Sequence, residues 1–248
     1  MVEKGSPAEP GCGWICLALE REYPGEVDHA FRVGRFQEIT LMYVPAHFAQ
    51  TDPAKLFDFI EQNSFGLLMS QLAGEPFATH LPLLLDREAS LHGTLIGHVA
   101  RANPHWQTTD GNVLAVFSGP HSYISPSWYQ AENVVPTWNY LAVHAYGKLQ
   151  IVEDHAASVK IVQDFVAFYE KSMPRPWTVS PDDSFVDKMV RSVVCFRIEL
   201  SRLEGKWKLN QNHPRERREK VIDALKHRSD ENSQAIAALM AETLHGRS

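Results

Sequence analysis

Between residues 65 and 152, five short β-rich runs alternate with turn-forming residues, and no other pattern limits the possible folds as strongly. Turn residues such as Asp110-Gly111-Asn112 separate the runs. The predicted strands are Phe65–Ser70, Phe77–Leu85, Leu91–Ala100, Val113–Ser118 and Tyr140–Val152. Because such short connections have no room for crossover helices, we predict an antiparallel sheet that closes into a barrel.

Helical patterns lie on both sides of these strands. Asp52 is suited to cap a helix with Pro53 at its first position, and Asp154 is suited to cap a second helix. Periodicity and capping predict helices over 52–63, 154–171, 184–191, 214–226 and 230–244, and a last strand over Val193–Leu200.

The composition indicates a globular protein outside the membrane. The chain has 24 basic and 30 acidic residues, and 44% of its residues are hydrophobic. Its longest apolar runs, Trp14–Leu19 and Leu81–Leu85, are far shorter than the roughly 20 residues that span a bilayer. Three cysteines are too few for a disulfide framework, and the N-terminus does not resemble a secretory signal. We therefore expect a cytoplasmic location.

The segment Gly205–Arg228 is basic, with eight Lys or Arg residues and three acidic residues. Such a segment can attract nucleic acid, or it can be the solvated face of a helix. Common catalytic signatures are absent from the chain, and its twelve histidines form no compact set of metal ligands. We therefore assign no catalytic residue and expect no metal site.

Small polar and aromatic residues gather at the predicted strand ends, where core packing does not require them. They lie in segments 78–82, 100–106, 119–129 and 135–140. Arg, Ser and Thr side chains can bind a phosphate, Asn and backbone groups can bind ring heteroatoms, and aromatic side chains can stack on a ring. These residues indicate a planar, partly anionic ligand, or else turns beside buried aromatic residues.

At these positions the chain resembles the PaiB-type FMN-binding negative transcriptional regulators, from Met42 to about Leu244. The matching segments are Met42–Pro45, His47-Phe48, Asn63–Gly66, Phe77–Leu83, His98–Pro104, Gly119–Tyr129, Val135–Tyr140 and Lys206–Asn212. The resemblance implies an α+β fold, a predominantly antiparallel split β-barrel with flanking helices, as in pyridoxamine-phosphate oxidases and flavin reductases. It also implies a homodimer with FMN near the subunit interface.

Domain boundaries follow from this resemblance and from the patterning of the chain. Residues 1–41 are rich in Gly, Pro and Glu and show no sustained period, so we expect an N-terminal extension that is disordered or not native. The predicted FMN-binding domain covers residues 42–212. A helical tail follows over residues 213–248.

The first half of the predicted FMN site lies in two of the segments that match the family, Phe77–Leu83 and His98–Pro104. Arg101 is the first candidate for the FMN phosphate because its planar fork makes paired, charge-assisted hydrogen bonds, with Ala102 and Asn103 as further donors. Thr79 and His80 point to opposite faces of a strand, so only one of them can face the flavin. We expect Thr79 to do so, with His80 as a neighbour.

The remaining candidates lie in two predicted loops and beyond the last strand. They are Ser125, Trp128, Thr137, Trp138, Asn139, Lys208 and Gln211. The loop residues would close over the ring or the phosphate, including from the partner subunit. Trp128 and Trp138 can equally pack in a dimer interface, and Lys208 can equally be solvated.

Two functions are expected from these observations. The first is an FMN-binding, PaiB-type regulator that acts as a homodimer. The alternative is an FMN-dependent oxidoreductase of the flavin reductase or pyridoxamine-phosphate-oxidase-like class, so the sequence leaves open whether the protein is an enzyme. Direct DNA binding has weak support, because the helix Asn232–Leu244 contains almost no Lys or Arg to read bases.

Overall fold

The computed structural model describes residues 42–108, 110–178 and 184–245, so the predicted N-terminal extension lies outside the described residues. Its strands form one sheet in the order β3-β2-β6-β7-β8-β5-β4, with β1 paired to β8. All of these pairings are antiparallel. The strands are β1 (Ala49–Gln50), β2 (Phe65–Leu72), β3 (Glu75–Pro82), β4 (Leu84–Asp86), β5 (Thr94–Ala100), β6 (Asn112–Ile124), β7 (Thr137–Ile151) and β8 (Val193–Lys208).

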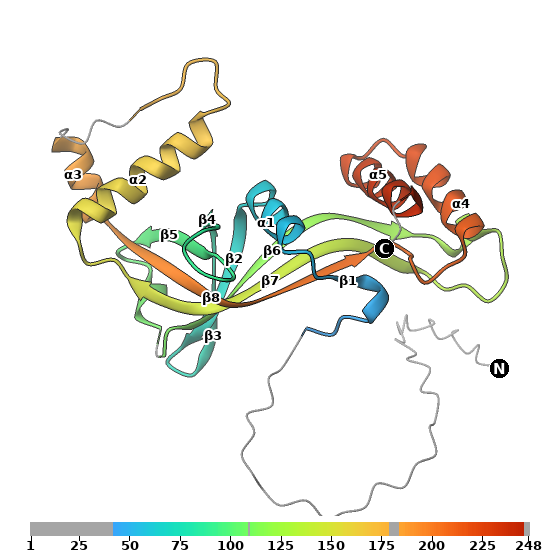
Figure 1. Ribbon diagram of the computed structural model, residues 1–248, viewed down its shortest axis with the longest axis horizontal. Helices are drawn as coiled ribbons and strands as arrows, with labels where there is room; N and C mark the ends of the chain where they lie inside the picture. Colours follow the sequence, from blue (N-terminus) through green and yellow to red (C-terminus); the bar gives the residue numbers. More distant parts are fainter. Residues whose placement is uncertain (1–41, 109, 179–183, 246–248) are drawn as a thin grey trace, which may run out of the picture. The chain divides into compact units, whose positions relative to one another are not determined.

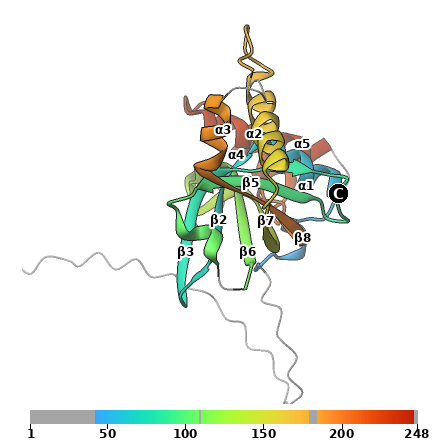
Figure 2. The ribbon, with the colours of Figure 1, turned by 90° about the vertical axis from the view of Figure 1, so that its left-hand side faces the viewer.

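Helices flank this sheet, as Figures 1 and 2 show. The α-helices are α1 (Pro53–Gln62), α2 (His155–Glu170), α3 (Ser184–Arg191), α4 (Arg215–Lys226) and α5 (Glu231–His245), and the 3-10 helices are η1 (Ala46–Phe48), η2 (Pro104–Gln107) and η3 (Pro126–Tyr129). Asp52 and Asp154 cap α1 and α2 as predicted, since each side chain accepts a backbone N–H of the first turn. The described residues contain no helix long and apolar enough to cross a bilayer.

The core lies inside the curved sheet, where alternate residues of the strands point inward. Ala115, Phe117, Val143 and Ile198 are completely buried there. Each large apolar side chain removed from water in this way stabilises the fold by about 1.5–3 kcal/mol. These observations confirm the predicted α+β class with a predominantly antiparallel split barrel.

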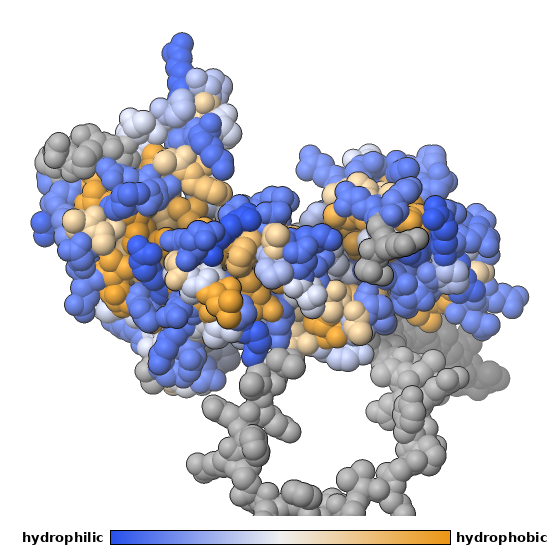
Figure 3. All heavy atoms as spheres, in the orientation of Figure 1, coloured by the Kyte–Doolittle hydropathy of each residue, from blue (hydrophilic) through white to orange (hydrophobic). Residues whose placement is uncertain are grey.

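The C-terminal helices belong to the same core. Val221 and Leu225 of α4, and Ile236 and Met240 of α5, are completely buried within the main hydrophobic cluster. A second cluster under α2 contains Leu84, Ile161, Phe165 and Cys195, and Figure 3 shows apolar residues at the surface around α2 and α3. The tail thus packs on the sheet, and a domain boundary at residue 212 stays a prediction.

Two irregularities bend the longest strands. The register of β6 against β7 shifts between Ser118 and His121, and that of β7 against β8 shifts at Gly147. A Cβ atom on Gly147 would lie 2.4 Å from the carbonyl oxygen of Glu199, so the backbones approach too closely for a side chain. Beyond these bends, β6 and β7 continue toward α4 and α5 (Figure 1).

Several strand boundaries differ from the prediction. The predicted run Phe77–Leu85 forms two strands, because the Leu83 N–H donates to the Ser64 carbonyl oxygen and the chain then changes its partner from β2 to β5. Strand β5 begins at Thr94, later than the predicted Leu91. Strands β6 and β8 extend well past their predicted ends because their polar outer residues interrupt the apolar alternation without interrupting the backbone ladder.

These longer strands correct the predicted setting of four site residues. Thr137, Trp138 and Asn139, expected in a loop, form the start of β7 and pair with β6. Lys208, expected beyond the last strand, is the final residue of β8 and pairs with Tyr140.

Candidate flavin site

The predicted site residues form two groups at opposite ends of β8. The Arg101 group consists of Thr79, His80, Arg101, Ala102 and Asn103, and the Trp138 group consists of Ser125, Trp128, Thr137, Trp138, Asn139, Lys208 and Gln211. Ala100 pairs with Val193 at the start of β8, whereas Tyr140 pairs with Lys208 at its end. The structure therefore does not bring all of the predicted residues together within one subunit.

Arg101 follows β5, and its guanidinium is held by backbone carbonyl groups. Its Nε donates to the Arg191 carbonyl oxygen at 2.9 Å, and its Nη2 donates to the Val193 carbonyl oxygen at 2.8 Å. A guanidinium has five N–H donors, so three remain available for an anion. The side chain is thus fixed in orientation and still able to bind a phosphate.

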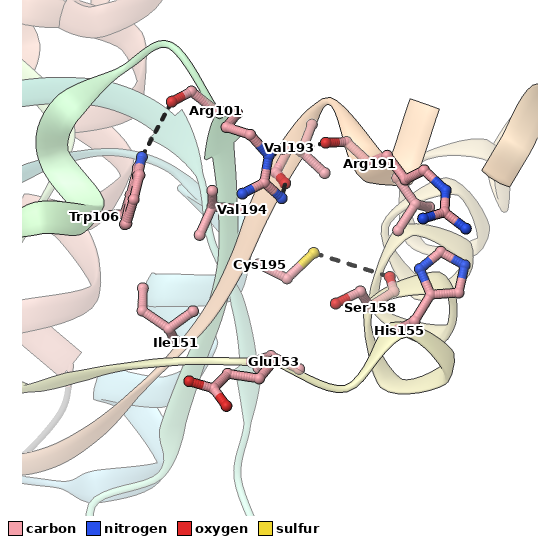
Figure 4. Close-up of a pocket in the computed structure, with 12 residues that line it drawn as sticks. Arg101, Trp106, Ile151, Glu153, His155, Ser158, Arg191, Val193, Val194 and Cys195 are labelled. Atoms are coloured by element: carbon pink, nitrogen blue, oxygen red, sulfur yellow. Dashed lines mark hydrogen bonds between the residues drawn. The ribbon is translucent and has the colours of Figure 1, made fainter. Parts of the chain in front are cut away.

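Arg101 also lines a large hollow, which we call the arm hollow (Figure 4). This hollow has a volume of about 700 Å³. Its walls come from the ends of β5 and β7, the start of β8, and helices α2 and α3, and they include Trp106, Ile151 and His155.

Thr79 faces the interior of the barrel end. Its hydroxyl oxygen accepts the Asn103 Nδ2–H at 3.2 Å and lies 2.8 Å from Nδ1 of His105. His105 is 1% exposed, burial lowers its pKa, and its Nε2 has no hydrogen-bond partner among the described residues. The Thr79 hydroxyl is therefore engaged within the protein, and the backbone of Thr79 pairs with Leu68 of β2.

His80, Arg101 and Ala102 are the exposed members of the Arg101 group. The His80 ring stacks on Phe65 with 6.4 Å between the ring centroids, on the face of the sheet opposite to Thr79. Of Thr79 and His80, it is therefore the His80 side chain that a ligand on the outer face of the sheet would contact.

The Trp138 side chain, 52% exposed, lies on the outer face of β7. Its ring centroid is 5.8 Å from that of Tyr123 and 6.3 Å from that of His121. Trp138 lines a second hollow of about 390 Å³, which we call the outer hollow, together with Tyr140 and His144. This hollow therefore offers aromatic surface on which a planar ring can stack.

His144 is a functional candidate that the sequence did not reveal. Burial lowers the pKa of His144, and its buried Nδ1 has no hydrogen-bond partner in the described structure. Such an atom needs a partner from a ligand, a water or a second subunit. The signal was only an alternation of aromatic and polar residues along the strand, at Trp138, Tyr140, His144 and Tyr146, which does not distinguish an inner from an outer face.

Other members of the Trp138 group have partners within the subunit. The Lys208 Nζ donates to the Thr137 hydroxyl oxygen, and burial lowers the pKa of Lys208. Asn139 is completely buried and its Nδ2 donates to the Met240 Sδ, so it lies on the face of β7 opposite to Trp138. Gln211 bonds to the backbone of its own turn, through Trp207 and Leu209.

The 3-10 helix η3 holds the last two members of this group. The Ser125 hydroxyl oxygen accepts the Ser127 N–H and caps η3, and Trp128 is half-buried against the main core. Of this group, Trp138 thus lines the outer hollow, whereas Ser125, Trp128, Asn139 and Gln211 are not among its lining residues.

The residues present fit a phosphorylated planar group in two separate parts. The Arg101 group has a fixed guanidinium with three remaining N–H donors, which suits a phosphate. The outer hollow has aromatic rings and the unpartnered Nδ1 of His144, which suit a heteroaromatic ring. Within residues 42–108, 110–178 and 184–245, no group of three His, Cys, Asp or Glu side chains could hold a metal ion.

The basic segment lies largely on α4, and part of its charge is paired. Arg215 Nε lies 2.7 Å from Glu219 Oε1, and Lys220 Nζ lies 2.9 Å from Glu216 Oε1. The Arg218 Nη2 donates to the Thr243 hydroxyl oxygen on α5. Acidic residues of the same helix therefore pair with Arg215 and Lys220, two of the five basic residues of α4.

Comparisons with known proteins place the chain in a family. The family described as "Putative FMN-binding domain" matches residues 42–202. The protease synthase and sporulation protein PAI 2 of Bacillus subtilis (strain 168) is 36% identical over 208 residues, which cover 82% of this chain and 98% of that protein. An uncharacterized protein of Aspergillus fumigatus is 28% identical over 253 residues, covering 81% of this chain and 97% of that protein.

Solved structures share the fold. The flavocytochrome Anf3 from Azotobacter vinelandii superposes with a TM-score of 0.50 at 15% identity, covering 64% of this chain and 69% of that one. The FAD and heme binding protein from Mycobacterium smegmatis superposes with a TM-score of 0.50 at 10% identity, covering 64% and 73%. The family predicted from the sequence, and FMN as its cofactor, are confirmed by the match over residues 42–202. The chain belongs to this FMN-binding family and is a relative of the B. subtilis PAI 2 protein over most of its length.

Proposed function

We propose that the protein is a homodimeric FMN-binding regulator in which the Arg101 group of one subunit and the Trp138 group of the other enclose one flavin. The observation that carries this proposal is the separation of the two groups along β8. This strand has 16 residues, about 50 Å of extended chain, which is more than one mononucleotide covers. A two-fold arrangement that places opposite ends of β8 together would unite the two halves of the site.

The outer face of the sheet supports this arrangement. Met69, Leu114, Val116 and Tyr140 point away from the barrel and are only half-buried or exposed. An apolar face of this kind is typical of a surface that another protein covers. A second copy would also provide surroundings in which the Nδ1 of His144 finds a partner, from the flavin or from the other chain.

Within the proposed site each side chain has a distinct task. FMN, when bound, supplies electron transfer, and the protein binds and orients it. Arg101 would hold the phosphate with its three remaining N–H donors, beside the exposed backbone of Ala102. Trp138 and Tyr140 would stack on the ring and exclude water from it, while His144 would bond to a ring heteroatom.

A regulatory role is supported by the relationship to a protein named for protease synthesis and sporulation. The ion pairs on α4 and the burial of α5 against the sheet argue against base recognition by these helices. We therefore place the regulatory function in the flavin site and the dimer, and not in a DNA-reading helix.

The second candidate is an FMN-dependent oxidoreductase, which one observation favours. His121 and His144 line the same outer hollow as Trp138, and burial keeps His144 neutral. A neutral imidazole beside a flavin can accept a proton during reduction or oxidation of a substrate. Consumption of NADH or NADPH by the FMN-loaded protein would favour this candidate over the regulator.

The deciding experiment combines light scattering after size exclusion with the absorption spectrum of the purified protein in the presence of FMN. We expect a dimer with one FMN per chain. Leu114→Glu, on the outer face, should yield monomers that lose FMN, whereas Gln150→Glu, at the exposed far end of β7, should change neither property. A wild-type monomer that binds one FMN would refute the shared site.

A further inference from the structure

The arm hollow has more room and more polar groups than a single phosphate requires. Its volume of about 700 Å³ is within the range of pockets that enclose whole ligands, roughly 300–1,000 Å³. Arg101, the proposed phosphate ligand, lies on one wall, and the hollow extends from there to Ile151 and the first turn of α2 (Figure 4). A group attached to the flavin phosphate would therefore have space to continue into it.

The wall of helices α2 and α3 carries further hydrogen-bonding side chains. Arg191 lies beside the carbonyl groups that hold Arg101, and His155 faces it from the first turn of α2 (Figure 4). Both side chains contact Asp187, at 2.8 Å from Arg191 Nε to Oδ2 and 2.8 Å from His155 Nε2 to Oδ1. The Asp187 carboxylate thus compensates the charge of Arg191, whereas Arg101 donates to backbone carbonyl oxygens and pairs with no carboxylate in the described part of the chain.

The remaining walls suit a flat, weakly polar group. Trp106 is half-buried, and its Nε1 donates to the Arg101 carbonyl oxygen at 3.2 Å, which fixes the indole next to the phosphate ligand. Val190, Val194 and Cys195 contribute an apolar floor. The single acidic lining residue, Glu153, lies across the hollow from Arg101 (Figure 4), where it can accept hydrogen bonds from an amino group or a ribose hydroxyl.

We propose that the arm hollow binds the adenylate half of FAD, so that the protein accepts FAD as well as FMN. This inference rests on the proposed function, because it places the flavin phosphate at Arg101. The second phosphate of the dinucleotide then lies between Arg101 and Arg191, the adenine stacks on Trp106, and the ribose faces Glu153. A base stacked on an aromatic side chain and a diphosphate between two guanidinium groups are both favourable contacts.

The test compares the affinities of the two flavins for the full-length apoprotein by quenching of flavin fluorescence. We expect FAD to bind at least as tightly as FMN, and AMP to compete with FAD but not with FMN. Ile151→Trp, which fills the end of the hollow away from Arg101, should weaken FAD at least tenfold and leave FMN unchanged. Leu91→Trp, at a position that is 89% exposed and outside the hollow, is the matched control.

A second variant keeps the test valid if Ile151→Trp does not fold. Trp106→Leu should weaken FAD about tenfold through the loss of base stacking, with a much smaller effect on FMN. FAD binding ten times weaker than FMN in the wild type, or equal effects of both variants on the two flavins, would overturn the inference. If neither flavin binds, the proposed function itself has failed.

Discussion

Replacing Arg101 by alanine separates a ligand-binding role from a structural one. In the structure its guanidinium donates to two carbonyl groups, Arg191 at the end of α3 and Val193 at the start of β8. If Arg101 also binds the flavin phosphate, the substitution removes a charge-assisted contact of about 1.5–3 kcal/mol. The dissociation constant of FMN should then rise about 10- to 150-fold.

The same substitution also has a calculable effect on stability. Two exposed hydrogen bonds to carbonyl groups are worth about 1–2 kcal/mol in total. For a chain of this size, each kcal/mol lowers the melting temperature by about 2–4 °C, so we expect a decrease of about 2–8 °C. Arg101→Lys keeps the positive charge and loses the fork, so its affinity for FMN should lie between those of the wild type and Arg101→Ala.

The assay is a titration of apoprotein with FMN, followed by flavin fluorescence, alongside thermal unfolding without ligand. Arg197→Ala is the control, because Arg197 is an exposed arginine on the same strand, β8. An Arg101→Ala protein with a lower melting temperature but an unchanged affinity for FMN would show that Arg101 only secures the end of α3. The phosphate would then have to bind elsewhere.

Two further predictions concern stability. Gly147→Ala should lower the free energy of unfolding by about 1–3 kcal/mol, because the new Cβ would lie 2.4 Å from the Glu199 carbonyl oxygen; an unchanged urea midpoint would contradict this close approach. Burial lowers the pKa of His98, His105 and His144 below their ordinary 6.5, so the unfolded chain binds protons there before the folded protein does. The urea midpoint should therefore fall as the pH decreases below 6.5, and His98→Gln should reduce this fall; an equal fall in wild type and variant would argue against a contribution from His98.

Local signals were sufficient for the helices. Asp52 and Asp154 cap α1 and α2 with their own side chains, so a few neighbouring residues determine where these helices begin. The ends of the strands were harder to predict. The polar outer residues of β6 and β8 hide the apolar alternation, while the backbone hydrogen bonds with β7 continue past them. Pairing with a strand far away in the sequence decided those boundaries.

The types of residue in the candidate site could be predicted from the sequence, but their arrangement in space could not. The segment that contains Arg101 is recognisable from the sequence, but its distance from Trp138 depends on the full length of β8. His105 and His144 were missed for the same reason. Their burial results from contacts with Thr79 across the barrel end and from the register of β7 between β6 and β8.

The burial of Val221, Leu225, Ile236 and Met240 within the main core also affects how the chain folds during synthesis. These residues follow the barrel strands in the sequence and leave the ribosome after them, so the nascent barrel exposes an apolar surface until α4 and α5 have emerged. A chain truncated before α4 would therefore be prone to aggregation and proteolysis. Tags or fusions at the C-terminus should be joined through a linker that lets α5 reach the sheet.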